Sequence, residues 1–457
     1  MRQSKKLLLF ITLILLVFGL ASCQKDAKPP VYEEDLTMHI GAWVSPSTVK
    51  DEEGNYKYIT LEQYQRIKDS GINVIYALYE HIDLNATLLA LDLSEQVGIE
   101  YYVRDSRVAG LFQDIFDSNG NVIQSEYEDD LEIFLNAIEP YKDHPAFKGH
   151  LIVDEPSADL YQWLGFYHEV YQEYLPDKDF YVNLFPTYAS LAARGDRDYE
   201  DYIGEYIEVV KPKFVSYDHY PLMLFYEESV LTDDYLLNLE IVATKSKEAG
   251  LPFWLFLQSV GYFNITGTQR RDITEADLRF QSAVAMAYGT KGIQHFTYWT
   301  PDSGGIESFS DAFITKDGEK TPTYDAGTKV NHEILSFDHV YLSFDWQSVM
   351  TYSTTPDFPN TNFRMINTED KHKRIKSFKG TEDVLIGTFK GQNKEDGFMV
   401  VNFTDPAFGK TNDVTITFND ASHALVYIDG VEQTVKLNKG KLTLNLASGS
   451  SAFVIPY

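Results

Sequence analysis

The sequence predicts a (β/α)8 barrel followed by a C-terminal antiparallel β-sandwich. Between residues 38 and 335, eight continuous apolar segments alternate with amphipathic segments of helical period. Continuous apolar runs are typical of parallel strands that are buried on both faces. Residues 380–457 instead contain short Val-, Thr- and Tyr-rich segments separated by turns. The length of the chain agrees with two domains. Beyond a predicted N-terminal leader, about 435 residues remain, which is more than one core usually supports.

The first 22 residues are a leader and not part of the fold. A basic start, MRQSKK, precedes the apolar run LLLFITLILLVFGL and then Leu-Ala-Ser-Cys, which is the layout of a signal peptide. Cys23, the only cysteine of the chain, stands where a bacterial lipobox has its lipidated residue. The alternative is an ordinary secretory signal with a chance cysteine. A transmembrane helix is disfavoured because the apolar run is shorter than about 20 residues.

A lipid on Cys23 would tether the protein to the cell envelope, and we expect the outer membrane. Residues 23–37 then form a polar tether. Without a second cysteine, no intramolecular disulfide can form. Loss of the three cations Arg2, Lys5 and Lys6 with the leader takes the formal net charge from −29 to −32. So acidic a protein repels nucleic acid and anionic polymers, which favours a neutral or cationic substrate.

The helical segments have recognisable faces and ends. Leu61, Tyr64 and Ile67 fall on one face of a helix that Gly71 terminates. Thr274 is a predicted N-cap of the segment before the last strand. No Gly-rich turn follows the first strand, which disfavours a dinucleotide-binding sheet and leaves the barrel. The candidate strands are 39–46, 72–79, 99–105, 147–156, 179–187, 212–222, 252–261 and 292–301.

Residues 336–379 separate the two predicted domains. They are rich in proline and asparagine and include the basic cluster KHKRIK, so we predict connecting loops with a solvated basic face. The segments of 380–457 are separated by turns such as Asp429-Gly430 and Lys439-Gly440. No row of aromatic residues stands out in this domain, so we expect it to support the barrel and not to bind glycan.

The run FKGHLIVDEP is the most informative part of the barrel. It ends a buried strand in Asp154-Glu155-Pro156, at the rim where barrels of this class keep their chemistry. Adjacent carboxylates repel each other, so structural uses for such a pair are few. We predict that Glu155 is a general acid. Asp154 and an apolar surrounding would both raise its pKa toward neutrality.

Other strand ends bring carboxylates, an amide and aromatic rings to the same rim. Aromatic faces stack on a sugar ring while carboxylates and amides bind its hydroxyls, so the rim suits a carbohydrate. Trp43 can instead close the barrel, Arg104 can pair with Asp105, and His219 can be a structural histidine. The predicted substrate-binding residues are Trp43, Arg104, Asp154, Asn183, His219, Tyr220, Gln258 and Trp299.

These motifs resemble family 42 glycoside hydrolases, the β-galactosidase barrels of a larger retaining-glycosidase clan. The last strand and its loop, GTKGIQHFTYWTPDSGGIESF, are similar to the family's aromatic-Trp strand and Gly-Gly-x-Glu loop. Residues 218–221, Asp-His-Tyr-Pro, resemble the family's Asp-x-Tyr-Pro on the sixth strand. Residues 154–156 stand where the clan has Asn-Glu-Pro. The resemblance implies a glycosidase with Glu155 as proton donor.

The seventh strand departs from the family. It reads PFWLFLQSVG, so Leu257 or Gln258 occupies the position of the nucleophilic glutamate. Neither can form a glycosyl ester, and two carboxyls about 5 Å apart are therefore not provided by this strand. One alternative is that Asp218 acts as the base or second carboxylate, roughly 6.5–9.5 Å from Glu155 with a water between them.

Two further alternatives remain. In N-acetylhexosaminidases an Asp-Glu pair assists attack by the substrate's own acetamido group, and Asp154 with Glu155 would fit if a local bulge lets both side chains reach the pocket. The other alternative is a non-catalytic glycan-binding lipoprotein. No HExxH, Cys/His cluster, Gly-rich phosphate loop or G-x-S-x-G is present, so we predict no cofactor and no metal. The predicted function is hydrolysis of a neutral oligo- or polysaccharide.

Overall fold

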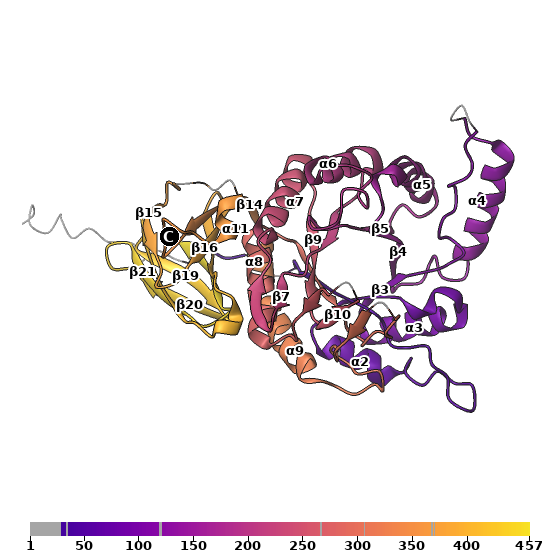
Figure 1. Ribbon diagram of the computed structural model, residues 1–457, viewed down its shortest axis with the longest axis horizontal. Helices are drawn as coiled ribbons and strands as arrows, with labels where there is room; N and C mark the ends of the chain where they lie inside the picture. The colour runs from indigo at the N-terminus through magenta and orange to yellow at the C-terminus, as the bar shows by residue number, and fades with distance from the viewer. Residues whose placement is uncertain are drawn as a thin grey trace, which may run out of the picture.

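A computed structural model describes residues 29–32, 35–117, 121–265, 267–305, 307–366, 369 and 371–457. Cys23, the predicted lipidation site, lies outside these ranges. Eight parallel strands close into a barrel in the order β1-β12-β9-β6-β5-β4-β3-β2, as the sequence predicts (Figure 1). Within the described ranges, no helix is long and apolar enough to span a membrane.

All eight predicted strands are present, each within or near its predicted bounds. The barrel strands are β1 (His39–Trp43), β2 (Val74–Tyr76), β3 (Glu100–Val103), β4 (Phe147–Asp154), β5 (Asp179–Leu184), β6 (Val215–Asp218), β9 (Phe253–Gln258) and β12 (Gly292–Phe296). The helices around them are α2 (Leu61–Asp69), α3 (Leu84–Val97), α4 (Gln124–Ile138), α5 (Tyr161–Tyr174), α6 (Tyr199–Val210), α7 (Tyr235–Ala249), α8 (Glu275–Ala287) and α9 (Pro322–Leu335).

The predicted helix signals have the expected local structure, with one exception. The Thr274 side chain accepts from the Asp277 backbone N–H and Asp277 returns the interaction, so α8 begins with a complete capping box. In α2, Tyr64 and Ile67 are buried as predicted, but Leu61 is 44 % exposed. Gln63 occupies the buried face instead and donates to the backbone carbonyl of Gly318.

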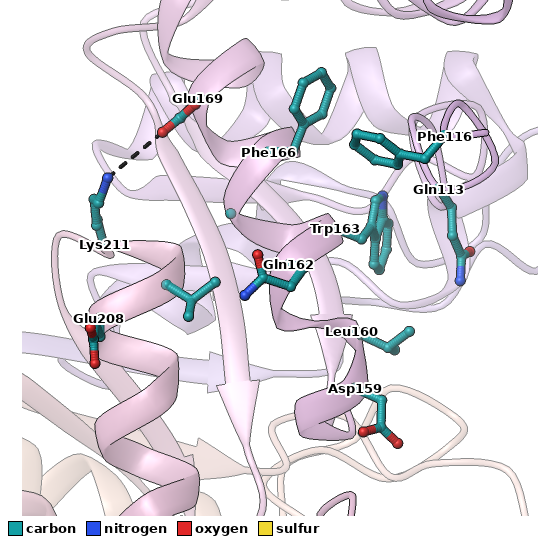
Figure 2. Close-up of a pocket in the computed structure, with 12 residues that line it drawn as sticks. Gln113, Phe116, Asp159, Leu160, Gln162, Trp163, Phe166, Glu169, Glu208 and Lys211 are labelled. Atoms are coloured by element: carbon teal, nitrogen blue, oxygen red, sulfur yellow. Dashed lines mark ion pairs between the residues drawn. The ribbon is translucent and has the colours of Figure 1, made fainter. Parts of the chain in front are cut away.

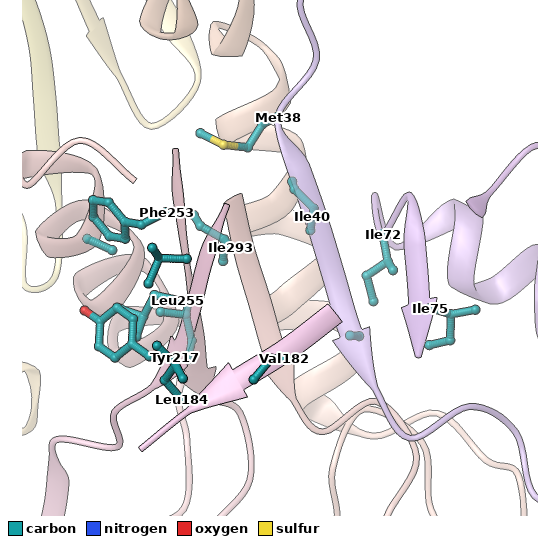
Figure 3. Close-up of a cluster of buried hydrophobic side chains, with 14 of the residues drawn as sticks. Met38, Ile40, Ile72, Ile75, Val182, Leu184, Tyr217, Phe253, Leu255 and Ile293 are labelled. Carbon is teal, nitrogen blue, oxygen red and sulfur yellow. The ribbon is translucent and has the colours of Figure 1, made fainter. Parts of the chain in front are cut away.

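The barrel has an aliphatic outside and an aromatic inside. Ile40, Ile75 and Leu255 point outward to the helices (Figure 3). Inside, the rings of Tyr76 and Tyr102 stack at 4.8 Å. A Cβ atom on Gly41 would lie 2.7 Å from the Tyr76 ring, so the absence of a side chain there makes room for the interior aromatics. The interior is therefore a packed core and not a channel.

Loops that follow three barrel strands build a second sheet, which we call the rim sheet. Its strands are β7 (Leu222–Phe225), β8 (Glu228–Leu231), β10 (Tyr262–Asn264), β11 (Gln269–Arg270) and β13 (Glu307–Phe309). They pair in the order β13-β10-β11-β7-β8. Because the loops leave from the carboxyl ends of β6, β9 and β12, this sheet lies at the rim that carries the predicted site.

The C-terminal domain is an antiparallel β-sandwich, as predicted. One sheet has six strands in the order β14-β16-β17-β22-β19-β20, and the other has three in the order β15-β18-β21. Their bounds are β14 (Phe344–Tyr352), β15 (Ile375–Lys379), β16 (Val384–Gly391), β17 (Asp396–Asn402), β18 (Asn412–Phe418), β19 (His423–Ile428), β20 (Val431–Lys436), β21 (Lys441–Leu446) and β22 (Ser451–Pro456).

Residues 336–379 are more structured than the connecting loops that we predicted. They contain α10 (Asp338–Leu342), α11 (Thr361–Met365) and two strands of the sandwich, β14 and β15. β14 forms the edge of its sheet and pairs only with β16. An edge strand needs only one covered side, so its polar sequence FDWQSVMTY lacks the apolar run that marks a central strand.

The six-stranded sheet packs against both the smaller sheet and the barrel helices. In β17, Phe398 and Val400 face the interior of the sandwich, whereas Met399 and Val401 join the core shared with the barrel. Alternating side chains therefore serve two cores. At the closest point, a Cβ atom on Gly387 would lie 2.1 Å from the backbone oxygen of Ala287, at the end of α8.

Candidate active site

The end of β4 directs two neighbouring carboxyl groups to the rim. Its pairing with β5 shifts register between Leu151 and Val153, and Glu155 has a φ of 51°, in the left-handed region. In a regular strand, neighbouring side chains point to opposite faces. These irregularities let Asp154 and Glu155 share one site, which is the local distortion that a paired Asp-Glu mechanism requires. A non-glycine residue at this φ is uncommon and typical of functional sites.

Asn183 on β5 links the carboxyl groups of β4 and β6. Its Nδ2 donates to Asp154 Oδ1 at 3.1 Å and to Asp218 Oδ1 at 3.0 Å. Its Oδ1 accepts from Ser216 Oγ at 3.1 Å. Because the Ser216 hydroxyl also accepts from Gln294 Nε2 inside the barrel, the hydroxyl proton is available to Asn183. The barrel interior thus fixes the orientation of the amide toward both carboxylates.

Glu155 and Asp218 are hydrogen-bonded to each other through their carboxyl groups. Two carboxyls in contact cannot both ionise, so the pair holds a proton. Burial and then the negative charges of Asp218 and Asp154 raise the pKa of Glu155 well above its usual range. Burial and Asp154 also raise the pKa of Asp218, whereas hydrogen bonds from Asn183 and Glu155 oppose this. In this hydrogen bond, Glu155 therefore donates the proton and Asp218 accepts it.

Asp154 is the third carboxyl group of the site. Burial raises its pKa to about 6, although the hydrogen bond from Asn183 and the charge of Arg104 oppose the shift. Asp154 is an exposed residue, so solvent at the barrel mouth limits this effect of burial. Asp154 is ionised at neutral pH, whereas Glu155 keeps its proton.

An inverting mechanism would need roughly 6.5–9.5 Å between the two carboxyl groups, with a water between them. In the structure, the two carboxyl groups affect each other directly, and Asp218 raises the pKa of Glu155. Asp218 is therefore placed to favour the protonated form of Glu155.

Aromatic rings form one wall of the mouth. Trp43 lies 6.2 Å from Phe256 and 6.0 Å from Phe296, and Tyr220 lies 5.0 Å from Phe296 between ring centroids. Tyr262 of the rim sheet meets Tyr220 edge-on at 6.2 Å. Trp43 and Tyr220 lie at the mouth, where the sequence analysis expected them, but it did not include Phe296 and Tyr262. Phe296 could have been found because it ends the last barrel strand.

Three predicted substrate-binding residues are buried away from the mouth. The His219 side chain is fully buried, with Nε2 3.3 Å from Asp234 and rings of Tyr188 and Tyr235 beside it. It alternates with Asp218 and Tyr220 and so points out of the barrel. Trp299 is 1 % exposed and packs on Tyr58 in the main core.

Gln258 is the third, and it occupies the strand end where the family resemblance places a nucleophile. It is fully buried. Its Oε1 accepts from the Leu222 backbone N–H at 3.1 Å, and its Nε2 donates to the carbonyls of Leu222 and Arg271. Gln258 thus ties the rim sheet to the barrel and does not reach the substrate side.

Two charged residues of the rim sheet were also missed. Glu307 of β13 raises the pKa of Glu155 through its negative charge, and partial burial raises its own pKa. It belongs to the Gly-Gly-x-Glu loop, so a sequence signal existed. Arg270 of β11 had none, because its position depends on how two short strands pair. Among the described residues, no group of three or more His, Cys, Asp or Glu side chains is arranged to hold a metal ion.

A cavity of about 850 Å³ lies elsewhere, between α5 and α6 on the outside of the barrel. Figure 2 shows Phe116, Trp163 and Phe166 along it, with Lys211 and Glu169 3.8 Å apart at one end. None of the rim carboxylates lines it. The chemistry of the barrel mouth therefore does not extend to this cavity.

Residues 193–337 match the sequence model of glycoside hydrolase family 42, described as beta-galactosidase. The barrel is similar to this family. The match confirms the resemblance seen in the sequence and includes Asp218 and the rim sheet, but not residues 154–155. A catalytic mutant of a GH42 β-galactosidase from G. stearothermophilus has a similar fold, with a TM-score of 0.58 and 9 % identity over 93 % of this chain and 99 % of that one.

The β-galactosidase from Bacillus circulans sp. alkalophilus also has this fold, with a TM-score of 0.56 and 9 % identity over 93 % of this chain and 100 % of that one. Against the β-galactosidase from Marinomonas ef1 the TM-score is 0.46 at 10 % identity, over 66 % of this chain, which spans only 60 % of that enzyme's length. No curated protein matches the chain. The family resemblance and the shared fold indicate a glycosidase-type barrel, and the chemistry must be argued from the site.

Proposed function

We propose that this protein is a glycoside hydrolase in which Glu155 protonates the oxygen of the departing group. One observation carries the proposal. The carboxyl groups of Glu155, Asp218 and Asp154 meet at the mouth of a (β/α)8 barrel, and burial together with the two neighbouring carboxylates raises the pKa of Glu155. A glycosidic bond breaks only slowly unless an acid assists its leaving group, and a carboxyl group with a raised pKa supplies that acid at neutral pH.

The surroundings of this proton donor support a carbohydrate substrate. Trp43, Tyr220, Phe296 and Tyr262 provide apolar ring faces, while Asp154, oriented by Asn183, provides acceptors for hydroxyl groups. The acidic chain disfavours a polyanion, so we propose an oligo- or polysaccharide that is neutral along most of its length. β-Galactosides are the first substrates to try because the matched family model is described as beta-galactosidase.

A second candidate is the substrate-assisted hydrolysis of an N-acetyl sugar. The observation that favours it is the positive φ of Glu155, which brings Asp154 to the same site. In this mechanism the substrate's acetamido oxygen attacks the anomeric carbon while Glu155 protonates the departing oxygen. The ionised Asp154 would accept the acetamido N–H. Water then opens the resulting ring and restores the proton to Glu155.

The Glu155→Gln variant tests the role of Glu155. With an aryl glycoside whose leaving group needs no proton, such as 2,4-dinitrophenol, kcat should fall little. With a leaving group that needs protonation, kcat should fall about 10²- to 10⁴-fold, the usual contribution of a general acid. Equal losses on both substrates would rule Glu155 out as the acid. Glu200→Gln, an exposed acid on α6, is the matched control.

Activity and binding assays on a panel of glycosides also separate an enzyme from a non-catalytic glycan-binding protein. A matched set of aryl β-galactosides, β-glucosides and N-acetyl-β-glucosaminides distinguishes the two mechanisms, because only the N-acetyl sugar has the acetamido group that substrate-assisted hydrolysis requires. If the wild-type protein binds one of these sugars but hydrolyses none, the enzyme proposal fails and glycan binding remains.

We also propose that Cys23 carries a lipid that anchors the protein to the cell envelope. The support is the sequence of the leader alone. Replacing Cys23 by Ser should move the mature protein from the membrane fraction to the soluble fraction of the envelope. Persistence of the Cys23→Ser protein in washed membranes would contradict the anchor.

A further inference from the structure

Arg270 of the rim sheet is a buried cation that forms no ion pair with the residues that the structure describes. It is 6 % exposed, and neither its Nε nor its Nη1 has a hydrogen-bond partner among the described residues. Its Cζ lies 5.2 Å over the ring of Tyr188, and Tyr262 stands opposite it on β10. The ring stabilises the positive charge but accepts no hydrogen bond in the guanidinium plane. A buried charge in this condition is costly unless a ligand completes it.

The pairing of the rim sheet directs Arg270 toward the mouth of the barrel. Arg270 pairs with Tyr262 across β11 and β10, and Tyr262 pairs with Phe309 across β10 and β13. Residues directly opposite each other on neighbouring strands share a face of the sheet. Tyr262 meets the mouth residue Tyr220 edge-on at 6.2 Å, so the face that carries Arg270 is the face toward the mouth. Arg270 therefore lies on the mouth side of the rim sheet.

We propose that Arg270 binds an anionic group on one sugar unit of the substrate, the carboxylate of a hexuronic acid. This proposal rests on the proposed function and refines its substrate. Charge-assisted hydrogen bonds from a guanidinium to a carboxylate are among the strongest in proteins, and the planar fork suits a planar acid. Tyr188 and Tyr262 hold the guanidinium in place, so little ordering is needed when the sugar binds.

A single acidic unit is compatible with the acidity of the chain. The net charge of −29 acts over long distances, and salt screens it beyond about 8 Å at physiological ionic strength. Arg270 would neutralise one carboxylate at contact. Many carboxylates in a row would remain unpaired, so the substrate would have one uronic acid at or next to the cleaved bond and not a run of them. A sulfate ester presents similar anionic oxygens, and the experiment separates the two.

The test compares matched aryl glycosides on the full-length protein. The wild type should hydrolyse an aryl β-galacturonide or β-glucuronide with a kcat/KM about 10-fold or more above that of the corresponding neutral glycoside. Arg270→Gln should lower kcat/KM for the uronide about 10- to 100-fold and change that for the neutral glycoside less than about threefold. Arg270→Lys keeps the charge but not the fork and should retain part of the preference. Preference for a 6-sulfated galactoside over both sugars would instead identify a sulfate ester.

Two controls distinguish the loss of the anion site from misfolding and from the loss of catalysis. Arg364→Gln removes an exposed arginine and should leave the preference unchanged. Free galacturonate and glucuronate should raise the melting temperature of the wild type and of Glu155→Gln, but not that of Arg270→Gln. If the neutral glycosides are the better substrates in every pair, or if Arg270→Gln lowers both activities equally, the anion site is refuted. Absence of all hydrolysis with the uronate-dependent shift intact would refute the proposed function alone.

Discussion

Asp218→Asn should shift the pH range in which Glu155 keeps its proton. The Asp218 carboxylate lies in hydrogen-bond contact with Glu155, so the two charges would be about 4 Å apart, which corresponds to about 4 kcal/mol at an effective dielectric constant of 20. Solvent at the mouth reduces this to about 2–4 kcal/mol, or about 1.5 to 3 pH units. Because an amide carries no charge, the pKa of Glu155 should fall by that amount.

The assay is kcat/KM as a function of pH on an aryl glycoside whose leaving group needs protonation. The alkaline limb of this profile reports the loss of the proton from the acid of the free enzyme. In Asp218→Asn this limb should move to lower pH by about 1.5 to 3 units. Asp159→Asn, which removes an exposed carboxylate near the end of β4, should leave the limb in place. An unchanged limb in Asp218→Asn would refute the idea that Asp218 holds the proton on Glu155.

The same variant should be more stable than the wild type. Both carboxyl groups have a raised pKa in the folded protein, so the folded state binds more protons than the unfolded state. Stability therefore falls as the pH rises from the ordinary carboxyl pKa through the raised one. Removing Asp218 abolishes its own part of this loss and the part that its charge adds at Glu155, so the gain in unfolding free energy should be larger at pH 8 than at pH 5. Urea unfolding at both pH values measures it.

Three further substitutions test the frame around the site. Arg271→Met leaves Asp277 and Asp405, which its guanidinium contacts at 2.6 and 2.7 Å, buried without a cation, and should destabilise the protein by about 3–5 kcal/mol in urea unfolding. Gln258→Glu places a carboxyl oxygen against two backbone carbonyls and should lower the unfolding free energy by about 3 kcal/mol or more, as measured by urea unfolding. It should not create a nucleophile, so no glycosyl ester should be trapped on this variant. Asn183→Ala removes a donor to the ionised Asp154, and an NMR titration of that carboxyl should show its pKa, about 6 in the wild type, raised by about one unit. An unchanged titration would show that Asn183 does not stabilise the Asp154 charge.

The barrel could be predicted because its signals are local. Each buried parallel strand needs a run of apolar residues, and each helix end needs a cap, so the pattern appears within a few residues of sequence. Thr274 and the eight apolar runs are examples. Edge strands need less apolar surface, so the sequence of β14 does not by itself predict a strand.

Strand alternation would have improved the prediction of the site. Asp218 and Tyr220 share a face of their strand end, so His219 between them must point the other way. The burial of Gln258 and Trp299 could not be foreseen in this way. It depends on the rim sheet and on the packing of the loop after β12, which bring together segments far apart in the chain.

The sequence by itself determined the architecture and indicated Glu155 as the candidate acid, because apolar periodicity and a strand that ends in Asp154-Glu155 are written in consecutive residues. The tertiary structure decided what lies opposite that acid. The left-handed backbone of Glu155 and the closure of β4, β5 and β6 side by side bring its carboxyl group next to that of Asp218, with Asn183 linking Asp218 to Asp154. The rim sheet then placed Arg270 on its mouth side. Contacts of this kind join side chains from different strands and loops, so no local pattern encodes them.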